Sequence, residues 1–342
     1  MSASDSSAAV TVAIPVRDGG EPLAGVLAAL ARQTVEHELL VCDSGSRDGS
    51  AAVARSHGAR VIEIAPERFN HGATRNLLMS EACGAHVALL TQDAEPAGER
   101  WLEQLLGGFT LAPDVGIVYG PYRPREGASA PVRIELERWF SSLSPDRQPS
   151  VERLAEHERG LPVAQLAGRR GFFTDANACI ARAAWERAPF REISYAEDRA
   201  LALDMLRAGY AKAFVPAAAV LHSHDYTPLE HARRCFDEWR GLREVYGLRE
   251  PACPRALVRG LRGELGAARR ELDGGGASGR ARPAILGAVA LHHATRTTGA
   301  LLGSRADVLP PWLRRALSHE GRGEFRPLDF KLSGEAVDNN QR

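Results

Sequence analysis

Short apolar runs alternate with amphipathic stretches over residues 10–122. The apolar runs predict five buried strands, at 10–15, 38–43, 60–64, 86–91 and 115–119. The amphipathic stretches predict helices, among them one that begins at Pro22 and others at 73–83 and about 98–112. Strands that alternate with helices of about 10–15 residues imply right-handed crossovers and a mainly parallel sheet. The predicted fold class is therefore α/β.

The remaining sequence predicts an excursion from the sheet, a return to the core and a helical end. The segment 123–170 is rich in Arg, Glu, Pro and Ser, with one helical patch at 134–143. Core-like sequence returns at 171–180 and 213–216, and a helix is predicted at 198–208. After Pro228 the pattern is helical and rich in Arg, with a last helix at 283–303. We expect a main domain at 8–247, a helical C-terminal extension at 248–325 with a hinge near 273–283, and flexible tails at 1–7 and 326–342.

Composition excludes some classes of protein. The chain has 43 basic and 43 acidic residues, and this zero net charge argues against nucleic acid as a partner. No stretch reaches the roughly 18–20 consecutive apolar residues that a bilayer requires. No secretory signal is visible, and the five cysteines form no C-x-x-C pair, which is typical of a cytoplasmic protein.

The charge is unevenly distributed along the chain. Residues 231–282 hold 12 Arg against 7 Asp and Glu, a local net charge of +5. This basic region is a candidate for peripheral contact with anionic lipids on the inner face of the membrane. The interspersed acids favour a solvated helix face over this contact.

Polar clusters follow four of the predicted strands. They lie at 15–20, 43–50, 70–76 and 91–95. A single cluster of this kind is explained by the turn preferences of Asp, Gly and Ser. Four in succession indicate a ligand site, because open parallel sheets bind ligands at the carboxyl ends of their strands.

The order of these clusters resembles the family 2 glycosyltransferases, inverting enzymes with the GT-A fold. Asp43 to Ser50 has the form Asp-x-Gly-Ser-x-Asp-Gly-Ser, which follows the second strand of those enzymes. Thr91-Gln92-Asp93 stands at their Asp-x-Asp metal motif, of which only the second Asp is kept, and Glu197-Asp198 stands at the pair that contains their base. The resemblance covers roughly residues 8–247. It implies that this segment is a GT-A catalytic domain, with a Rossmann-like, mainly parallel sheet flanked by helices.

Several segments are most similar to the rhamnosyltransferase branch of that family. They lie at 69–76, 91–94, 173–177, 195–198, 222–226 and 309–318. This similarity implies dTDP-L-rhamnose as the donor and a glycan, a lipid-linked saccharide or a small metabolite as the acceptor. A UDP- or GDP-sugar donor is the alternative within the same family.

A metal site is expected at Asp93. The leaving diphosphate needs a cation, and a carboxylate oxygen suits Mg²⁺ or Mn²⁺. The resemblance implies that His222 or His224 completes this site. The alternatives are that Asp93 caps a helix before Pro96 and that the two histidines are unrelated to a metal.

Asp198 is the expected general base, which removes the proton of the acceptor hydroxyl as its oxygen attacks the anomeric carbon opposite the diphosphate. Glu197 is expected to orient the site. Asp198 is also a candidate N-cap of the helix that follows, and the two roles are compatible because a helix N-terminus stabilises a carboxylate.

The nucleotide is expected beside Asp43 and Arg75. Asp43 can accept the N3–H of a pyrimidine, and the planar guanidinium of Arg75 can stack on the base or contact phosphate. A simple turn residue and a surface charge are the alternative interpretations. The predicted nucleotide-sugar site also contains Pro15, Val16, Arg17, Gln92 and Asp93. Asp175 and Asn177 are expected to line the acceptor side, or to form only a polar turn.

Three other functions are compatible with an α/β chain. Sugar nucleotidyl transfer favours a Gly-rich, Lys/Arg-bearing loop after the first strand, of which Gly19-Gly20 with Arg17 is a poor version. A non-catalytic binding module predicts loss of Asp93 or Asp198, and both are present. A Rossmann oxidoreductase is disfavoured, because no G-x-G-x-x-G follows the first strand.

Overall fold

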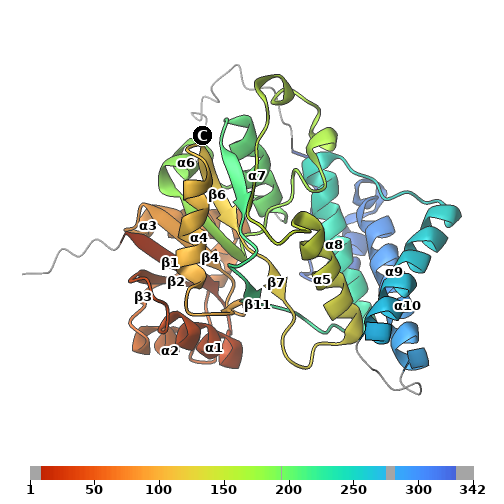
Figure 1. Ribbon diagram of the computed structural model, residues 1–342, viewed down its shortest axis with the longest axis horizontal. Helices are drawn as coiled ribbons and strands as arrows, with labels where there is room; N and C mark the ends of the chain where they lie inside the picture. Colours follow the sequence, from red (N-terminus) through yellow and green to blue (C-terminus); the bar gives the residue numbers. More distant parts are fainter. Residues whose placement is uncertain (1–8, 194, 275–281, 329–342) are drawn as a thin grey trace, which may run out of the picture.

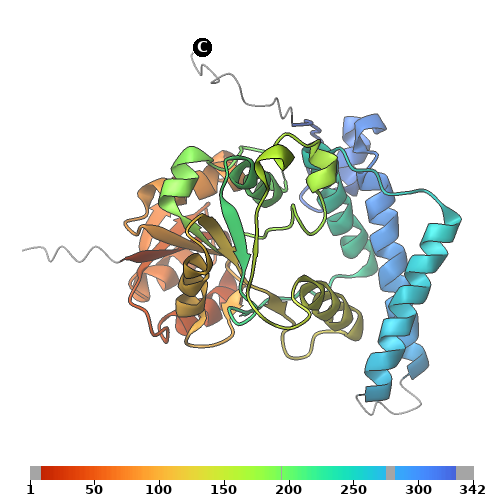
Figure 2. The same ribbon diagram turned by 45° about the horizontal axis from the view of Figure 1, so that its top comes forward.

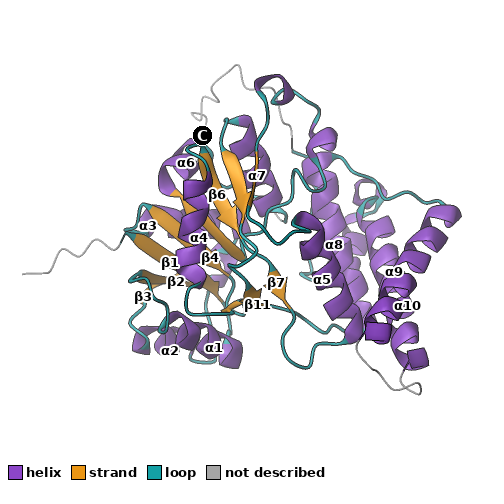
Figure 3. Ribbon diagram, viewed as in Figure 1, coloured by secondary structure: helices purple, strands orange, loops and turns teal. Residues whose placement is uncertain are grey.

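A computed structural model describes residues 9–193, 195–274 and 282–328 (Figure 1). The segment 1–7, most of the predicted hinge near 273–283 and most of the segment 326–342 lie outside these residues. The described part contains an eight-stranded sheet and a three-stranded sheet, with helices around them (Figure 3). The predicted α/β class is confirmed.

The large sheet has the strand order β3-β2-β1-β4-β9-β6-β10-β8. Its strands are β1 Val10–Val16, β2 Glu38–Asp43, β3 Arg60–Glu63, β4 His86–Leu90, β6 Val115–Tyr119, β8 Ser150–Glu152, β9 Asn177–Ala181 and β10 Ala211–Phe214. The pairs β1–β2, β2–β3, β1–β4 and β6–β10 are parallel. Strand β9 runs antiparallel to both β4 and β6, and β8 runs antiparallel to β10. The sheet is therefore mainly parallel, as predicted.

Helices cover both faces of the sheet because alternate strand residues point to opposite sides. One core contains Val12 and Ile14 of β1 and is covered by α1 Gly20–Leu30, α2 Ser50–Ser56 and α4 Trp101–Gly107. The other contains Ala13 and is covered by α3 His71–Glu81, α6 Arg182–Arg187 and α7 Glu197–Arg207. The helix α5 Ala130–Leu143, in the predicted excursion, adds Phe140 and Leu143 to the second core.

All five strands predicted over residues 10–122 are present, with ends displaced by one residue at most. The helix predicted at about 98–112 is shorter, because α4 ends at Gly107 and a 3-10 helix, η2 Gly108–Leu111, follows. A Cβ at Gly108 would lie 2.5 Å from Cγ1 of Val118, so only glycine allows this close approach to β6. The other 3-10 helices are η1 Pro66–Arg68, η3 Glu156–Glu158, η4 Val163–Leu166 and η5 Ala306–Val308.

The small sheet consists of three two-residue strands in the order β5-β11-β7. They are β5 Glu95–Pro96, β7 Tyr122–Arg123 and β11 Val220–Leu221. Strand β11 pairs antiparallel with β5 and parallel with β7. Three distant parts of the chain therefore meet at this sheet.

The C-terminal part is helical, and α8, α9 and α10 all contact the main domain (Figure 2). Its helices are α8 Pro228–Tyr246, α9 Pro254–Gly274, α10 Arg282–Gly303 and α11 Pro311–Leu317. Helices α8 and α10 cross closely at two glycines of α10: a Cβ at Gly303 would lie 2.3 Å from the carbonyl oxygen of Phe236, and one at Gly299 would lie 2.3 Å from that of Ala232. No helix among the described residues combines the length and apolar character needed to cross a bilayer.

Candidate active site

The site begins where the strand order reverses. Strands β2 and β3 lie on one side of β1 and β4 lies on the other, which makes the carboxyl ends of β1 and β4 a topological switch point. There the Gln92 side chain accepts a hydrogen bond from the Arg17 amide (2.8 Å) and donates one to the Arg17 carbonyl (3.1 Å). Pro15 and Val16 are the last two residues of β1. The predicted nucleotide-sugar residues of these two segments therefore lie together.

Asp43 ends β2 and is 3% exposed. Its Oδ1 accepts hydrogen bonds of 2.9 Å from the amides of Gly45 and Ser46. Gly45 has a φ of 88°, and a Cβ there would lie 2.6 Å from Cγ of Pro66, so the loop requires glycine. The Oδ2 of Asp43 is buried and has no hydrogen-bond partner among the described residues. A buried acceptor without a partner is costly, which marks this oxygen as one that a ligand can satisfy.

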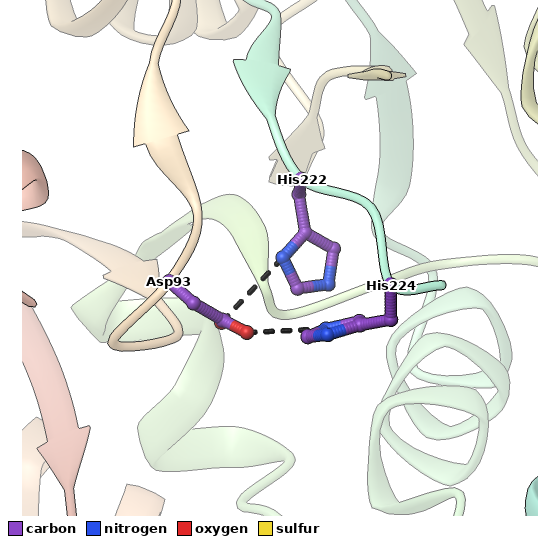
Figure 4. Close-up of side chains that lie close together, drawn as sticks. All are labelled: Asp93, His222 and His224. Atoms are coloured by element: carbon purple, nitrogen blue, oxygen red, sulfur yellow. Dashed lines mark ion pairs between the residues drawn. The ribbon is translucent and has the colours of Figure 1, made fainter. Parts of the chain in front are cut away.

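The small sheet brings Asp93, His222 and His224 together (Figure 4). Asp93 precedes β5 by two residues, and the two histidines follow β11. Oδ1 of Asp93 lies 3.5 Å from Nδ1 of His222, and Oδ2 lies 3.1 Å from Nε2 of His224. One ligand atom from each of the three residues falls within 4.8 Å of the others. A carboxylate and two imidazoles at these distances are able to hold a divalent metal ion.

The electrostatics of this cluster favour a carboxylate. Burial by itself would raise the pKa of Asp93, but a hydrogen bond from His224 and the charges of both histidines hold that pKa well below its usual value. Burial also lowers the pKa of His222, which favours the neutral imidazole that metals bind. Arg125, which the sequence did not single out, donates a 2.6 Å hydrogen bond to the Asp93 carbonyl.

Asp198 lies in the first turn of α7, where its carboxylate accepts a 2.7 Å hydrogen bond from the Arg199 amide. The alternative role of N-cap is wrong: Ala196 occupies that position, with a left-handed φ of 63°, and makes no side-chain cap. Burial raises the pKa of Asp198 to about 6, although the charge of Arg199 opposes this effect. A carboxylate with this pKa is ionised at neutral pH and is a better proton acceptor than an ordinary Asp.

Arg75 lies at the centre of a buried ion cluster, and this corrects the prediction of a nucleotide contact. Its side chain is held by two carboxylates, since Nη2 donates to Asp175 at 2.9 Å and Nη1 lies 3.0 Å from Oε1 of Glu197. Arg75 is only 4% exposed, which leaves no planar face open to a base. The guanidinium instead holds the carboxylates of Asp175 and Glu197 in place. Glu197 is the residue immediately before Asp198.

Asn177 is fully buried at the start of β9, and the prediction that it lines the acceptor side is wrong. Its Nδ2 donates to the carbonyls of Ala218 (2.8 Å) and Pro121 (3.2 Å). Its Oδ1 accepts a 2.9 Å hydrogen bond from Nε1 of Trp101. The whole amide is used inside the protein.

Tyr122 lies between the Asp93 cluster and the Asp198 region. Its ring makes an edge contact with His222, with 4.8 Å between the centroids. Its hydroxyl is hydrogen-bonded to Thr174, the neighbour of Asp175. Burial raises the pKa of Tyr122, and the charges of Asp198 and Asp175 raise it further. The two ends of the site are therefore adjacent.

A segment after α11, residues 318–323, reaches the same region, and we name it the C-terminal strap. Its His319 ring lies edge-on to Tyr226, which stacks on His224. Its Glu320 has Oε2 at 3.5 Å from Nε2 of His71, while Nδ1 of His71 lies 3.8 Å from Glu197. Neither Glu320 nor His319 is predicted from the sequence, because they stand in polar sequence just past the last segment that resembles the rhamnosyltransferases.

The strap is anchored by a buried charge pair on α8. Asp237 and Arg240 are both fully buried and lie 3.1 Å apart. Asp237 accepts hydrogen bonds from the Ser318 hydroxyl (3.0 Å) and the amides of His319 (2.7 Å) and Glu320 (3.2 Å). Arg240 donates to the carbonyl of Arg322 at 2.8 Å. These hydrogen bonds give the buried Asp237–Arg240 pair the polar partners that buried charges require.

Removal of the Arg75 charge tests the role of this ion cluster in stability. Arg75→Met leaves two buried carboxylates unpaired, so we expect the free energy of unfolding near pH 7 to fall by about 3–5 kcal/mol. The deficit shrinks as the pH falls from neutrality toward about 4, because burial raises the pKa of Asp175 to about 6 and its protonated carboxyl no longer needs the cation. Urea titrations across this pH range measure it, with the exposed Arg68→Met as the control. Unchanged stability with weakened nucleotide binding would instead restore the nucleotide contact predicted from the sequence.

Comparison with known proteins agrees with this geometry. The family model described as Glycosyl transferase family 2 matches residues 11–164. The O-antigen chain rhamnosyltransferase RfbN of Salmonella typhimurium is 32% identical over 239 residues, 67% of this chain and 70% of that protein. WbaN of Salmonella anatum, also an O-antigen chain rhamnosyltransferase, is 31% identical over 203 residues, 58% of this chain and 61% of that protein.

A solved structure supports the fold. The mannosyltransferase PcManGT from Pyrobaculum calidifontis, in complex with GDP-Man and Mn²⁺, superposes with a TM-score of 0.56 at 20% sequence identity. The superposition covers 88% of this chain and 86% of that one. The resemblance predicted from the polar clusters is thereby confirmed, and the chain belongs to glycosyltransferase family 2.

Proposed function

We propose that this glycosyltransferase moves L-rhamnose from dTDP-L-rhamnose to a hydroxyl of a glycan, a lipid-linked saccharide or a small metabolite, with inversion at the anomeric carbon. The observation that carries the proposal is the meeting of Asp93, His222 and His224 beside the cluster that contains Asp198. The names of the two Salmonella relatives support rhamnose as the sugar.

The donor binds at the switch point in this proposal. The free, buried Oδ2 of Asp43 accepts the N3–H of the pyrimidine, which favours thymine and uracil over cytosine, whose N3 carries no hydrogen. Pro15, Val16, Arg17 and Gln92 form the adjoining wall. The hydrogen bonds between Gln92 and Arg17 keep the ends of β1 and β4 together around the donor.

Asp93, His222 and His224 would hold Mn²⁺ or Mg²⁺ on the diphosphate. Two imidazoles with one carboxylate suit Mn²⁺ better than Mg²⁺, which prefers oxygen ligands. When bound, the cation stabilises the negative charge that develops on the leaving diphosphate. The mannosyltransferase with the related fold is in complex with Mn²⁺.

Asp198 acts as the general base. The acceptor oxygen forms a bond with the anomeric carbon as the bond from that carbon to the diphosphate oxygen breaks. The acceptor proton passes to the Asp198 carboxylate, and dTDP leaves with the electron pair of the broken bond. Glu197 and Asp175, held by Arg75, position the region that receives the acceptor.

The reaction is expected on the cytoplasmic side of a membrane. All five cysteines are free, which agrees with a reducing compartment. Helix α9 has several arginines, among them Arg255, Arg259 and Arg262, and the half-exposed Val258 lies between them. Such a helix can contact anionic lipid head groups and bring the enzyme to a lipid-linked acceptor.

The role of Asp198 is tested by its removal and by pH. We expect Asp198→Asn to lower kcat by about 10²–10⁴-fold, because the proton acceptor is lost. The base must be ionised, so the wild-type rate falls as the pH drops below about 6, the pKa to which burial raises this group. Initial rates of dTDP release from pH 4.5 to 9 measure both effects, with the exposed Glu192→Gln as the control. Near wild-type turnover by Asp198→Asn would remove it from the mechanism.

The donor is tested with a panel of nucleotide sugars. Release of nucleoside diphosphate from dTDP-L-rhamnose, dTDP-glucose, UDP-glucose and GDP-mannose is compared at equal concentration. We expect kcat/KM to be greatest for dTDP-L-rhamnose, by about tenfold or more, because substrates are discriminated by contacts that strengthen in the transition state. A preference for UDP-glucose would overturn the rhamnosyl assignment and leave the family assignment intact.

A further inference from the structure

A second group of metal-ligand side chains lies between three helices, apart from the candidate active site. It consists of Glu135 on α5, His231 on α8 and His292 on α10. These helices lie side by side in Figures 1 and 2, and α10 contacts both of the others. One ligand atom from each residue falls within 4.8 Å of the others. The glycosyl transfer described above does not use any of them.

The hydrogen bonds around His231 fix its tautomer. The Thr295 hydroxyl lies 2.9 Å from the carbonyl oxygen of His292 and 3.1 Å from that of Leu291, so it donates its single hydrogen to the backbone one turn back. With its hydrogen on the backbone, the hydroxyl accepts from Nδ1 of His231, which lies 2.8 Å away. The lone pair of His231 is consequently on Nε2. A metal-binding imidazole has this arrangement, with its other nitrogen held by a fixed group.

The neighbours of the lone pair are also metal ligands by type. Sγ of Cys235 lies 3.5 Å from Nε2 of His231, and the two residues are four apart on α8, on one face of the helix. Nε2 of His292 lies 2.7 Å from Oε2 of Glu135. The His231 and His292 rings stack with their centroids 3.9 Å apart and 19° between their planes.

We propose that Glu135, His231 and His292 bind a zinc ion between α5, α8 and α10, and that Cys235, whose Sγ is near His231 but outside this group of mutually close ligand atoms, turns in as the fourth ligand. Two imidazoles, one carboxylate and one thiolate form a ligand set that Zn²⁺ takes in closed, tetrahedral sites. Rotation of the side chains closes the ligands around the ion, since Zn–N and Zn–O distances are about 2.0–2.2 Å. On binding, the proton between Glu135 and His292 and the thiol proton of Cys235 are released to solvent.

The consequence is a link between distant parts of the chain. Helix α5 belongs to the excursion between β7 and β8, whereas α8 and α10 belong to the C-terminal helices. Apolar contacts between these parts are few, with Ile134 of α5 packing near Val289 of α10 and Ala268 of α9. An ion that is bound only by the folded arrangement stabilises it.

The test must separate this site from Asp93, which offers similar ligands. We would use the full chain with Asp93→Asn and His224→Ala as the background, and titrate it with Zn²⁺ alone against a chromophoric chelator. One equivalent is expected to bind. Adding His292→Ala to this background should weaken zinc binding by about 100-fold or more, because a ligand is lost. Adding Thr295→Val should weaken it by about tenfold, because only the hydrogen bond to Nδ1 of His231 is lost. His57→Ala, an exposed histidine, serves as the matched control and should change nothing.

Two further measurements distinguish the loss of the zinc site from misfolding of a variant. Zn²⁺ should raise the Tm of the background protein and leave that of its His292→Ala form unchanged, with circular dichroism reporting that both are folded. Co²⁺ in place of Zn²⁺ should give a thiolate charge-transfer band that Cys235→Ser removes. Absence of stoichiometric Zn²⁺ binding in the background, or binding that His292→Ala leaves unchanged, would overturn the proposal. Neither result depends on glycosyl transfer.

Discussion

The buried amide of Asn177 is the contact on which the metal end of the site depends. Its Nδ2 donates to the carbonyls of Pro121 and Ala218, which stand just before β7 and β11. One side chain thus holds the starts of two short strands together. A Cβ at Gly120 would lie 1.8 Å from the Ala218 oxygen, so the approach also requires glycine at that position. Strands of two residues form too few backbone hydrogen bonds to fix their own register. The hydrogen bonds from the Asn177 amide fix the positions of the two strands instead.

The position of the metal ligands follows from this register. Strand β11 leads into His222 and His224, and its antiparallel partner β5 follows Asp93. At the other end of the site, Arg75 positions the carboxylates of Asp175 and Glu197, which lie beside Asp198. Two buried polar networks therefore position the two chemical functions. Tyr122 lies between them, in contact with His222 and bonded to Thr174.

Local patterns predicted the elements well. The five strands over residues 10–122 contain short apolar runs, and the loop from Asp43 to Ser50 has a glycine where φ must be positive. The proposed base and metal ligands were predicted through the resemblance to a family, and the structure brings Asp93, His222 and His224 together. Element ends were less predictable where packing overrides propensity, as at Gly108 against Val118.

The errors concern polar residues that turned out to be buried. Arg75 and Asn177 look like ligand contacts in a sequence, because nothing local distinguishes a polar side chain facing a ligand from one satisfied inside the protein. Their partners are far away in the chain: Asp175 for Arg75, and Pro121 and Ala218 for Asn177. Glu320 was missed for the same reason, since its approach to His71 depends on how Asp237 and Arg240 anchor the strap.

In the proposed mechanism, Asp93 on one side of the small sheet and His222 and His224 on the other bind one cation, which stabilises the leaving diphosphate. Electron spin echo spectroscopy of Mn²⁺ bound together with dTDP tests it most directly, because it detects nitrogen coordinated to the ion. We expect the wild-type signal to show nitrogen modulation from directly bound imidazole. This modulation should disappear when His222→Ala and His224→Ala are combined. An Mn²⁺–dTDP complex without nitrogen coupling, or with coupling that the double substitution leaves unchanged, would contradict it.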